Sequence, residues 1–420
     1  MTQRSPLARI SFLHITLHMP PDPPKTARPV AAQPKPIPTP ARTTSAPTAR
    51  VLSLDALRGF DMFWIIGGDK LALAILAMIP VANAPWVAQA KHQLEHSRWE
   101  GFTAYDLIMP LFLFVVGAAM PFSFARRADL GHSNSRMLFK LIRRTVILFI
   151  LGMAVQGHLL EFNLATLHPF SNTLQAIAVG YLFSGIFMLF LPVWAQIAGA
   201  IFLMLLYWGL LMFIPVPVEG QEAARGVLQE HANIAYMVEQ WVMRGFIDHT
   251  NPPYTWVLSG ITFTATTLLG VFAGYVLRGG SAPMMKFVWL TLLGVVYLAG
   301  GWAWAEYLHF PIIKHIWTSS MVLWAAGWSY LLLALFYLVI DVIGLRLIAF
   351  PLVVIGMNAI IAYVAYHLII PFDKISANLV GGLASHLSPA VGSFVLALTT
   401  VLLVWLLLYH LYRHKIFLRI

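Results

Sequence analysis

Residues 102–125 read FTAYDLIMPLFLFVVGAAMPFSFA, and only one of them, Asp106, is charged. An apolar stretch of about 20 residues is as long as an α-helix that crosses the hydrocarbon core of a bilayer. Similar stretches recur along the 420 residues, of which 59% are hydrophobic and only 10% are charged. A soluble domain has about a quarter of its residues charged. The sequence therefore predicts an all-α, polytopic helical membrane protein.

Ten apolar stretches are candidate transmembrane helices. Their approximate ranges are 54–79, 102–125, 137–157, 172–191, 193–214, 256–278, 284–305, 320–341, 347–371 and 389–412. Lys and Arg gather in alternate loops, above all in residues 126–144 and at the end of the chain, as the positive-inside rule expects of cytoplasmic segments. Ten spans then place both termini in the cytoplasm. Residues 1–50, rich in Pro, Thr, Ala and Arg, are expected to form a disordered cytoplasmic tail.

The composition also excludes several classes of protein. No cysteine is present, which removes disulfides, thiolate catalysis and Cys-bound metal clusters. The net charge of +10 does not indicate nucleic-acid binding, because the basic residues lie in loops between spans. No His pair has a zinc-binding spacing with a carboxylate on one helix face, so no metal centre is expected. Walker A and GxSxG motifs are absent, which leaves ATP-driven transport and serine hydrolysis without support.

Ionisable side chains in or beside the predicted spans are the first candidate functional residues, because charge is costly in a bilayer. Asp55 and Arg58 can pair on one helix face or simply cap the helix at the interface. Asp69 follows after roughly 20 Å of helix rise, so the first span carries polar groups near both membrane faces. His96 and Asp106 flank the entry into the second span. A carboxylate that holds one His nitrogen would leave the other as a general base or a nucleophile.

Other polar residues of the spans have two alternative roles. Asn172, Gln175 and Asn358 could form hydrogen bonds between helices or contact a ligand, and the sequence favours neither role. Gly270 and Gly274 form a small-xxx-small step, which favours close helix packing over phosphate binding.

Six motifs together resemble the heparan-alpha-glucosaminide N-acetyltransferase family, especially its bacterial members. They are VLSLDALRGFDMFW (51–64), HSRWEGFTAYDLIMPLFLFVVGAAMPFS (96–123), NTLQAIAVGYLF (172–183), TTLLGVFAG (266–274), FPIIKHIWTSSMVLWAAG (310–327) and PLVVIGMNAIIAY (351–363). The resemblance implies a transmembrane acyltransferase domain over residues 51–420 in a bacterial inner membrane, and a homodimer. It also implies acetyl transfer from cytoplasmic acetyl-CoA to a glucosamine-type amino sugar on the periplasmic side.

The resemblance also assigns roles to residues. The family's essential His stands in a His-x-x-Trp-x-Gly setting, here His96, Trp99 and Gly101, and the carboxylate of the motif falls on Asp106. Animal members carry an Asn-Tyr-Gly-Gly run before this His. The corresponding run here is 66–69, Ile-Gly-Gly-Asp, so Asp69 replaces the Asn and the identity of the acceptor is left open.

These arguments give three sets of expected site residues. The catalytic set is His96, Asp106 and Asp69. The acetyl-CoA set is Arg58, Arg127, Arg143, Arg144, Asn172, Gln175 and Asn358. Its basic residues would bind the phosphates of CoA, or they reflect only the positive-inside rule. The acceptor set is Trp99, Glu100, Lys314, His315 and Trp317.

Two other functions stay open at this stage. A carrier for an amino sugar or its acetylated form would also use intramembrane Asp residues and broken helices. An O-acyltransferase acting on a periplasmic glycan differs only in the acceptor, since a His base serves a hydroxyl as well as an amine.

Overall fold

The computed structural model describes residues 51–80, 84–218, 220, 222–246 and 250–418. The chain divides into two units, residues 1–48 and 49–420, and every described residue belongs to the second. The disordered tail predicted for residues 1–50 therefore lies outside the described residues.

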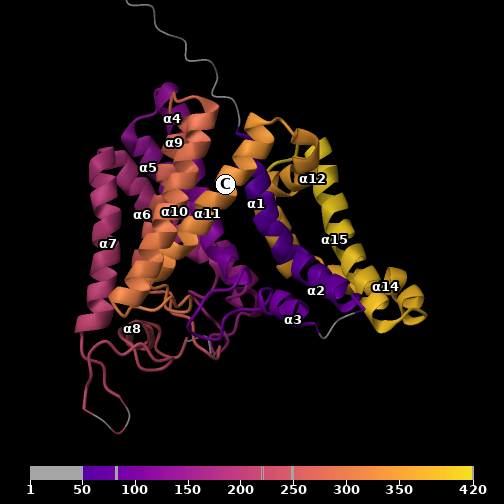
Figure 1. Ribbon diagram of the computed structural model, residues 1–420, viewed down its shortest axis with the longest axis horizontal. Helices are drawn as coiled ribbons and strands as arrows, with labels where there is room; N and C mark the ends of the chain where they lie inside the picture. The colour runs from indigo at the N-terminus through magenta and orange to yellow at the C-terminus, as the bar shows by residue number, and fades with distance from the viewer. Residues whose placement is uncertain (1–50, 81–83, 219, 221, 247–249, 419–420) are drawn as a thin grey trace, which may run out of the picture. The chain divides into compact units, whose positions relative to one another are not determined.

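The described unit is built from helices (Figure 1). The α-helices are α1 (Leu52–Phe63), α2 (Asp69–Ala77), α3 (Pro85–His92), α4 (Ile108–Asp129), α5 (Asn134–Val155), α6 (Thr173–Phe190), α7 (Val193–Phe213), α8 (Ile234–Met243), α9 (Gly260–Arg278), α10 (Pro283–Tyr307), α11 (Ser319–Tyr337), α12 (Arg346–Met357), α13 (Ala359–Val364), α14 (Phe372–Ser385) and α15 (Pro389–Arg413). Short 3-10 or π-helical segments are η1 (Trp64–Gly68), η2 (Tyr105–Leu107), η3 (Leu159–Glu161), η4 (Leu338–Val342) and η5 (Ala365–Ile369). The predicted all-α class is confirmed.

Seven helices of the described residues are long and apolar enough to cross a membrane, and they match seven of the ten predicted spans. An eighth span follows if the pair Arg346–Met357 and Ala359–Ile369, bent by 66°, is counted as one. The remaining two predicted spans, 54–79 and 137–157, are more charged. The first is α1–η1–α2, and the second is α5, which carries four Lys and Arg residues. The polytopic class is confirmed, although the count by these criteria is seven or eight rather than ten.

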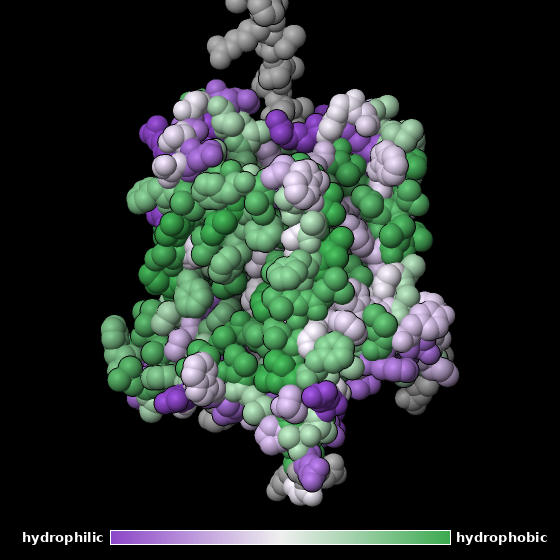
Figure 2. All heavy atoms as spheres, turned by 90° about the vertical axis from the view of Figure 1, so that its left-hand side faces the viewer, coloured by the Kyte–Doolittle hydropathy of each residue, from purple (hydrophilic) through white to green (hydrophobic). Residues whose placement is uncertain are grey.

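The outer surface fits a bilayer. Figure 2 shows a broad hydrophobic band between two polar ends on the face formed by α7. The side chains of α7 in this band are exposed, among them Trp194 and Phe202 at 73% and 62%. Apolar side chains exposed at this density are typical of a lipid-facing surface.

Two pairs of helices, α4 with α9 and α1 with α12, pack with their backbones in direct contact at glycine residues. A Cβ at Gly270 of α9 would collide with the backbone carbonyl of Phe114 on α4, and a Cβ at Gly274 would collide with that of Ala118. The expectation that these two glycines serve close helix packing is confirmed. Gly59 and Gly356 bring α1 and α12 equally close.

Candidate active site

Three charged or titratable side chains from distant parts of the sequence meet at the loop end of the bundle. His96 lies between α3 and η2, Asp106 in η2 at the start of α4, and Lys314 between α10 and α11. Nδ1 of His96 is 2.7 Å from Oδ1 of Asp106, and Nζ of Lys314 is 3.2 Å from the same oxygen and 3.0 Å from Nδ1. The predicted pairing of His96 with Asp106 is present in the geometry.

The carboxylate of Asp106 is held on every side. It is fully buried, and its Oδ2 accepts hydrogen bonds of 3.1 Å from the backbone N–H groups of Ser97 and Thr103 and from the Thr103 hydroxyl. An ionised carboxylate only accepts hydrogen bonds, so the tautomer with its proton on Nδ1 makes His96 a donor to Asp106 and leaves a free lone pair on Nε2. In that tautomer the Lys314 ammonium donates to Oδ1 of Asp106 and not to Nδ1.

Lys314 is also almost completely buried, with 4% of its side chain exposed. Burial lowers the pKa of its ammonium, and the neighbouring Asp106 carboxylate opposes that change. The two groups therefore form a buried ion pair, in which Asp106 stabilises the charged form of Lys314.

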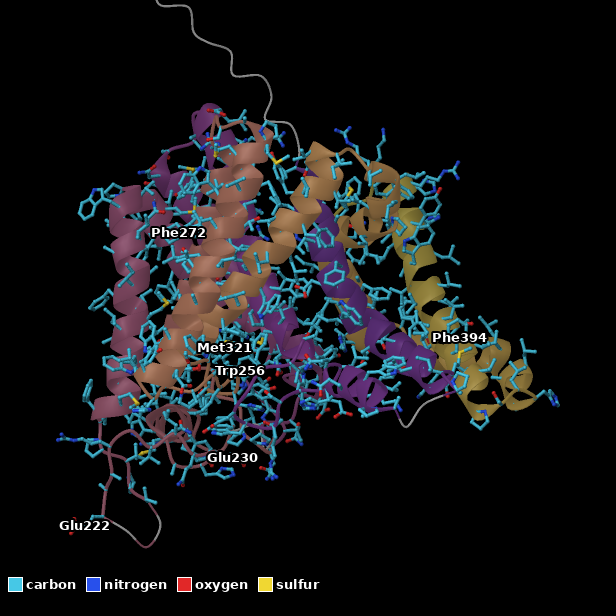
Figure 3. All side chains as sticks on the ribbon, viewed as in Figure 1. Glu222, Glu230, Trp256, Phe272, Met321 and Phe394 are labelled. Carbon is cyan, nitrogen blue, oxygen red and sulfur yellow. The ribbon has the colours of Figure 1, made fainter. Side chains whose placement is uncertain are left out.

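His96 opens into a cavity of about 310 Å³. We call it the His96 cavity. Aromatic and hydrogen-bonding side chains dominate its wall: Tyr105, Gln156, Asn172, Thr173, Tyr254, Trp256, Lys314, Tyr363 and His367. Trp256 lies where the loops meet the lower ends of the helices in Figure 3. Such a wall suits a small polar molecule with some apolar faces.

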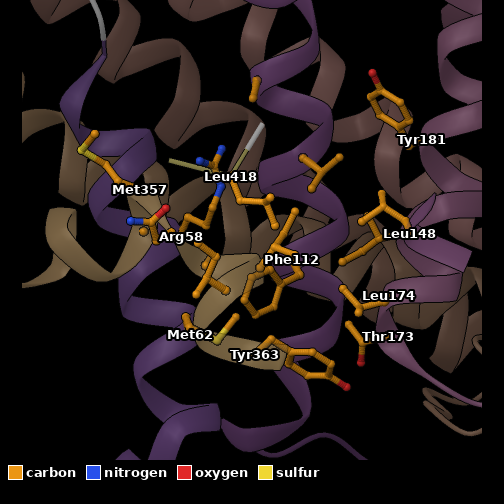
Figure 4. Close-up of a pocket in the computed structure, with 18 of the residues that line it drawn as sticks. Arg58, Met62, Phe112, Leu148, Thr173, Leu174, Tyr181, Met357, Tyr363 and Leu418 are labelled. Carbon is orange, nitrogen blue, oxygen red and sulfur yellow. The ribbon is translucent and has the colours of Figure 1, made fainter. Parts of the chain in front are cut away.

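A second cavity, of about 300 Å³, lies deeper in the helices, and we call it the arginine cavity. Figure 4 shows Arg58 on one wall and Leu148 and Tyr181 on the other, with Tyr363 and Thr173 at its lower end. Arg144 also lines it and lies over the Tyr181 ring at 4.5 Å. The remaining wall is mostly apolar.

The two cavities are neighbours. Ile65, Thr173 and Tyr363 line both of them, so these three side chains form the partition between the arginine cavity and the His96 cavity. Arg58 is close to the start of α1, and in Figure 1 this start lies at the same end of the bundle as the end of α4, where the basic loop 126–144 begins. The segment after α3, which carries His96, lies at the other end.

Comparison with known proteins agrees with the motifs. The chain is 24% identical over 424 residues to the heparan-alpha-glucosaminide N-acetyltransferase of Mus musculus, covering 89% of this chain and 62% of that protein. The Homo sapiens enzyme of the same name is also 24% identical, over 90% of this chain and 61% of its own length. The expected family resemblance is confirmed. This chain thus spans about three-fifths of the length of these relatives. In addition, residues 50–218 match the model of a domain of unknown function, DUF5009.

The residues expected to form the acceptor set do not all line the His96 cavity. Trp99 and Glu100 line a separate, open hollow beside Leu228. The indole N–H of Trp99 donates to the Leu228 carbonyl at 2.8 Å. Trp317 is a core residue, and its indole donates to the Thr266 hydroxyl at 3.0 Å. Of this set, only Lys314 lines the cavity.

Asp69, the residue at the position of the Asn of animal N-acetyltransferases, is linked to His96 through one side chain. The Tyr105 hydroxyl donates to Oδ2 of Asp69 at 3.3 Å. The Tyr105 ring packs against the His96 ring with centroids 4.8 Å apart. Asp69 therefore positions Tyr105, which itself faces the cavity.

The residues expected to bind acetyl-CoA divide into three groups. Arg58, Arg144 and Asn358 line the arginine cavity, and Asn358 Oδ1 is buried without a hydrogen-bond partner among the described residues. Asn172 lines the His96 cavity instead and caps α6. The groups outside both cavities are Gln175, which holds the Pro169 carbonyl, and the side chains of Arg127 and Arg143.

Sequence analysis did not single out most of the aromatic and polar residues in the His96 cavity, among them Tyr105, Gln156, Tyr254 and His367. His367 was the most accessible to prediction, because it is an ionisable residue inside a predicted span. It lies in the π-helical segment η5, and such segments often occur at functional sites. Among the described residues, no three His, Asp or Glu side chains gather as a metal ion would require.

His315 makes the stability of the loop end dependent on pH. Its ring stacks on Tyr254 at 4.2 Å and lies 5.5 Å from Trp99, and burial lowers its pKa to about 4. The unfolded chain then binds this proton more readily, so stability is complete above pH 6.5 and falls as the pH approaches 4. Between pH 7 and pH 5 the loss is about 2 kcal/mol.

We expect His315→Phe, which keeps an aromatic ring but cannot titrate, to remove most of this loss. Thermal unfolding at pH 7 and pH 5 measures it. The exposed His386→Phe is the control, and its pH dependence should equal that of the wild type. An equal loss in His315→Phe and the wild type would show that another group is responsible.

Proposed function

We propose that this protein is a transmembrane acetyltransferase of a bacterial inner membrane. It moves the acetyl group of cytoplasmic acetyl-CoA to an amino sugar of the glucosamine type on the periplasmic side. The observation that carries the proposal is that the arginine cavity and the His96 cavity are neighbours, with only Ile65, Thr173 and Tyr363 lining both. The similarity to named N-acetyltransferases supports the same chemistry.

The arginine cavity has the groups that an acetyl-CoA needs. Guanidinium groups bind phosphate oxygens with two parallel hydrogen bonds, which suits the 3′-phosphate and pyrophosphate of CoA. Nε of Arg144 is buried and has no hydrogen-bond partner among the described residues. The apolar wall beyond, with Met62 and Phe112, suits the thioester arm.

The His96 cavity supplies the base. The acceptor amine attacks the thioester carbonyl carbon, so that a C–N bond forms and the C–S bond breaks. Nε2 of His96 takes the proton that the amine loses and returns it to the leaving thiolate. Asp106 stabilises the imidazolium between these two transfers, and Lys314 stabilises Asp106. The same Nε2 also serves a two-step route, in which it carries the acetyl group briefly before the amine attacks.

The acceptor has partners on the other walls of the cavity. Tyr254 and Trp256 offer faces on which the C–H side of a sugar ring packs. Gln156 and Tyr363, which hydrogen-bond each other at 3.0 Å, offer polar atoms to its hydroxyl groups. An amine at His96 and hydroxyls at these side chains fit one monosaccharide within about 310 Å³.

Release of CoA thiol by the purified protein tests the proposal. Acetyl-CoA is supplied with glucosamine, with glucose, which lacks the amine, or without sugar. We expect release with glucosamine alone and N-acetylglucosamine as the product. Release with glucose would favour an O-acyltransferase. Uptake of glucosamine by proteoliposomes without acetyl-CoA, and no release, would instead indicate a carrier.

Arg144→Gln is expected to raise the KM for acetyl-CoA about tenfold or more and to leave kcat nearly unchanged, because a charge-assisted hydrogen bond contributes about 1.5–3 kcal/mol to binding. Steady-state kinetics at saturating glucosamine measure both constants. Arg143→Gln is the matched control, since Arg143 is the preceding residue but lies on the exposed side of α5. Equal effects of the two variants would contradict the placement of CoA.

A further inference from the structure

A third cavity, of about 440 Å³, lies between α1, α4, α11 and the segment before η2. Its wall is mostly aromatic and aliphatic, and no Lys, Arg or His contributes to it. We call it the aromatic cavity. Tyr105 and Ile108 line both this cavity and the His96 cavity, so they form the partition between the two. The proposed acetyl transfer makes no use of this space.

One charged group lines the aromatic cavity. Asp61 on α1 is fully buried, and neither of its carboxyl oxygens has a hydrogen-bond partner among the described residues. Asp106, equally buried, has five such partners. A buried carboxyl without a partner costs free energy, and within a membrane it indicates a functional site. A ligand in the cavity that Asp61 lines would supply this partner.

The aromatic rings indicate which partner this is. Trp324 and Trp328 of α11 stand at 79° to each other, with centroids 6.4 Å apart. Phe60 near the end of α1 and Trp64, the first residue of η1, stand at 87°, with centroids 5.9 Å apart. All four rings line the aromatic cavity, two from α11 and two from the segment α1–η1, and the faces of Trp and Phe rings attract an organic cation. A carboxylate in the same wall favours a positive ligand over a neutral one.

We propose that the aromatic cavity is a binding site for an organic ammonium ion with an apolar body. The ammonium group lies against Asp61 and the Trp rings, and the apolar body fills the remainder of the cavity. Trp328 is 42% exposed on the outer side of α11, which gives an amphipathic amine a route from the lipid. This site is separate from the acceptor site and does not depend on the proposed acetyl transfer.

Binding of benzyltrimethylammonium tests this site. Its uncharged carbon isostere, neopentylbenzene, has the same shape and serves as the matched probe. Tryptophan fluorescence is titrated in dodecyl maltoside, a detergent without charge or ammonium, with protein-free micelles as the blank. We expect the wild type to bind the ammonium at least about tenfold more tightly than the isostere.

Two variants make the test specific. Asp61→Asn should reduce the preference for the ammonium to about one, whereas Asp129→Asn, at the exposed end of α4, should keep it. Asp61→Asn removes a costly buried group, so it should fold at least as stably as the wild type. Trp328→Leu should weaken ammonium binding more than isostere binding. Equal binding of the two probes by the wild type, no binding of either, or an unchanged preference in Asp61→Asn would overturn the proposal.

Discussion

Acetyl transfer is expected to fall about 10³-fold or more when His96 is replaced by Gln, because the only change at the reacting atoms is the loss of a base. The Gln amide keeps a polar group of similar reach, but it does not take up a proton near neutral pH and so cannot act as the base. The His96 side chain is 44% exposed, so the substitution leaves no buried void. Release of CoA thiol in the presence of glucosamine measures the rate, and a thermal melt checks the fold.

The control for this variant is His386→Gln, which changes a histidine outside both cavities. It should keep the wild-type rate. A His96→Gln protein that melts like the wild type and retains more than about a tenth of its rate would exclude His96 as the base or nucleophile.

The second large effect concerns the buried pair of Asp106 and Lys314. Asp106→Asn leaves the ammonium of Lys314 buried without a counter-charge, and we expect a loss of about 3–5 kcal/mol in the free energy of unfolding. Lys314→Met leaves the carboxylate without one of its donors and destabilises in the same way. The double variant removes both charges, so its loss in the free energy of unfolding should be clearly smaller than the sum of the losses of the two single variants.

Thermal melts in one detergent rank the four proteins. The exposed pair of Lys70 and Asp373, with Nζ to Oδ2 at 2.6 Å, is the matched control, since its side chains are 51% and 55% exposed. The same exchange there should cost about 0–1 kcal/mol. Additive losses at Asp106 and Lys314, or equal losses at the two pairs, would show that the buried pair is not coupled as its geometry implies.

Sequence reasoning was most successful where the physical cause is local. A run of apolar residues long enough to cross a bilayer predicts a helix by itself, and seven such helices have the predicted places. His96 and Asp106 are ten residues apart in one segment, so their pairing could be proposed from the sequence, and the structure supplies the contact. The chemistry of the pair follows from the residue types alone.

Sequence reasoning could not predict contacts that depend on helix packing. Lys314 lies 208 residues from Asp106, and sequence analysis placed it among the acceptor residues rather than beside the carboxylate. Asn172 and Asn358 were expected at one ligand, but they line different cavities. No periodicity along the chain encodes which helix faces meet.

Irregular helices were also missed. Residues 347–371 read as one continuous apolar span, yet the chain bends by 66° at Asn358. Residues 54–79 read as another, but Ile66 and Gly67 leave helical geometry within η1. Both breaks border the cavities, where Asn358 and Ile65 lie. Apolar composition gives no sign of such breaks, because it is the same on either side of them.

The side of the membrane on which each substrate acts is the most direct test of the account. Inverted membrane vesicles expose the cytoplasmic face, so acetyl-CoA is added outside and glucosamine is enclosed. We predict N-acetylglucosamine inside these vesicles and CoA thiol outside, and neither product with His96→Gln. Product that forms only when both substrates share one side, or glucosamine that crosses unacetylated, would contradict transfer through the two cavities.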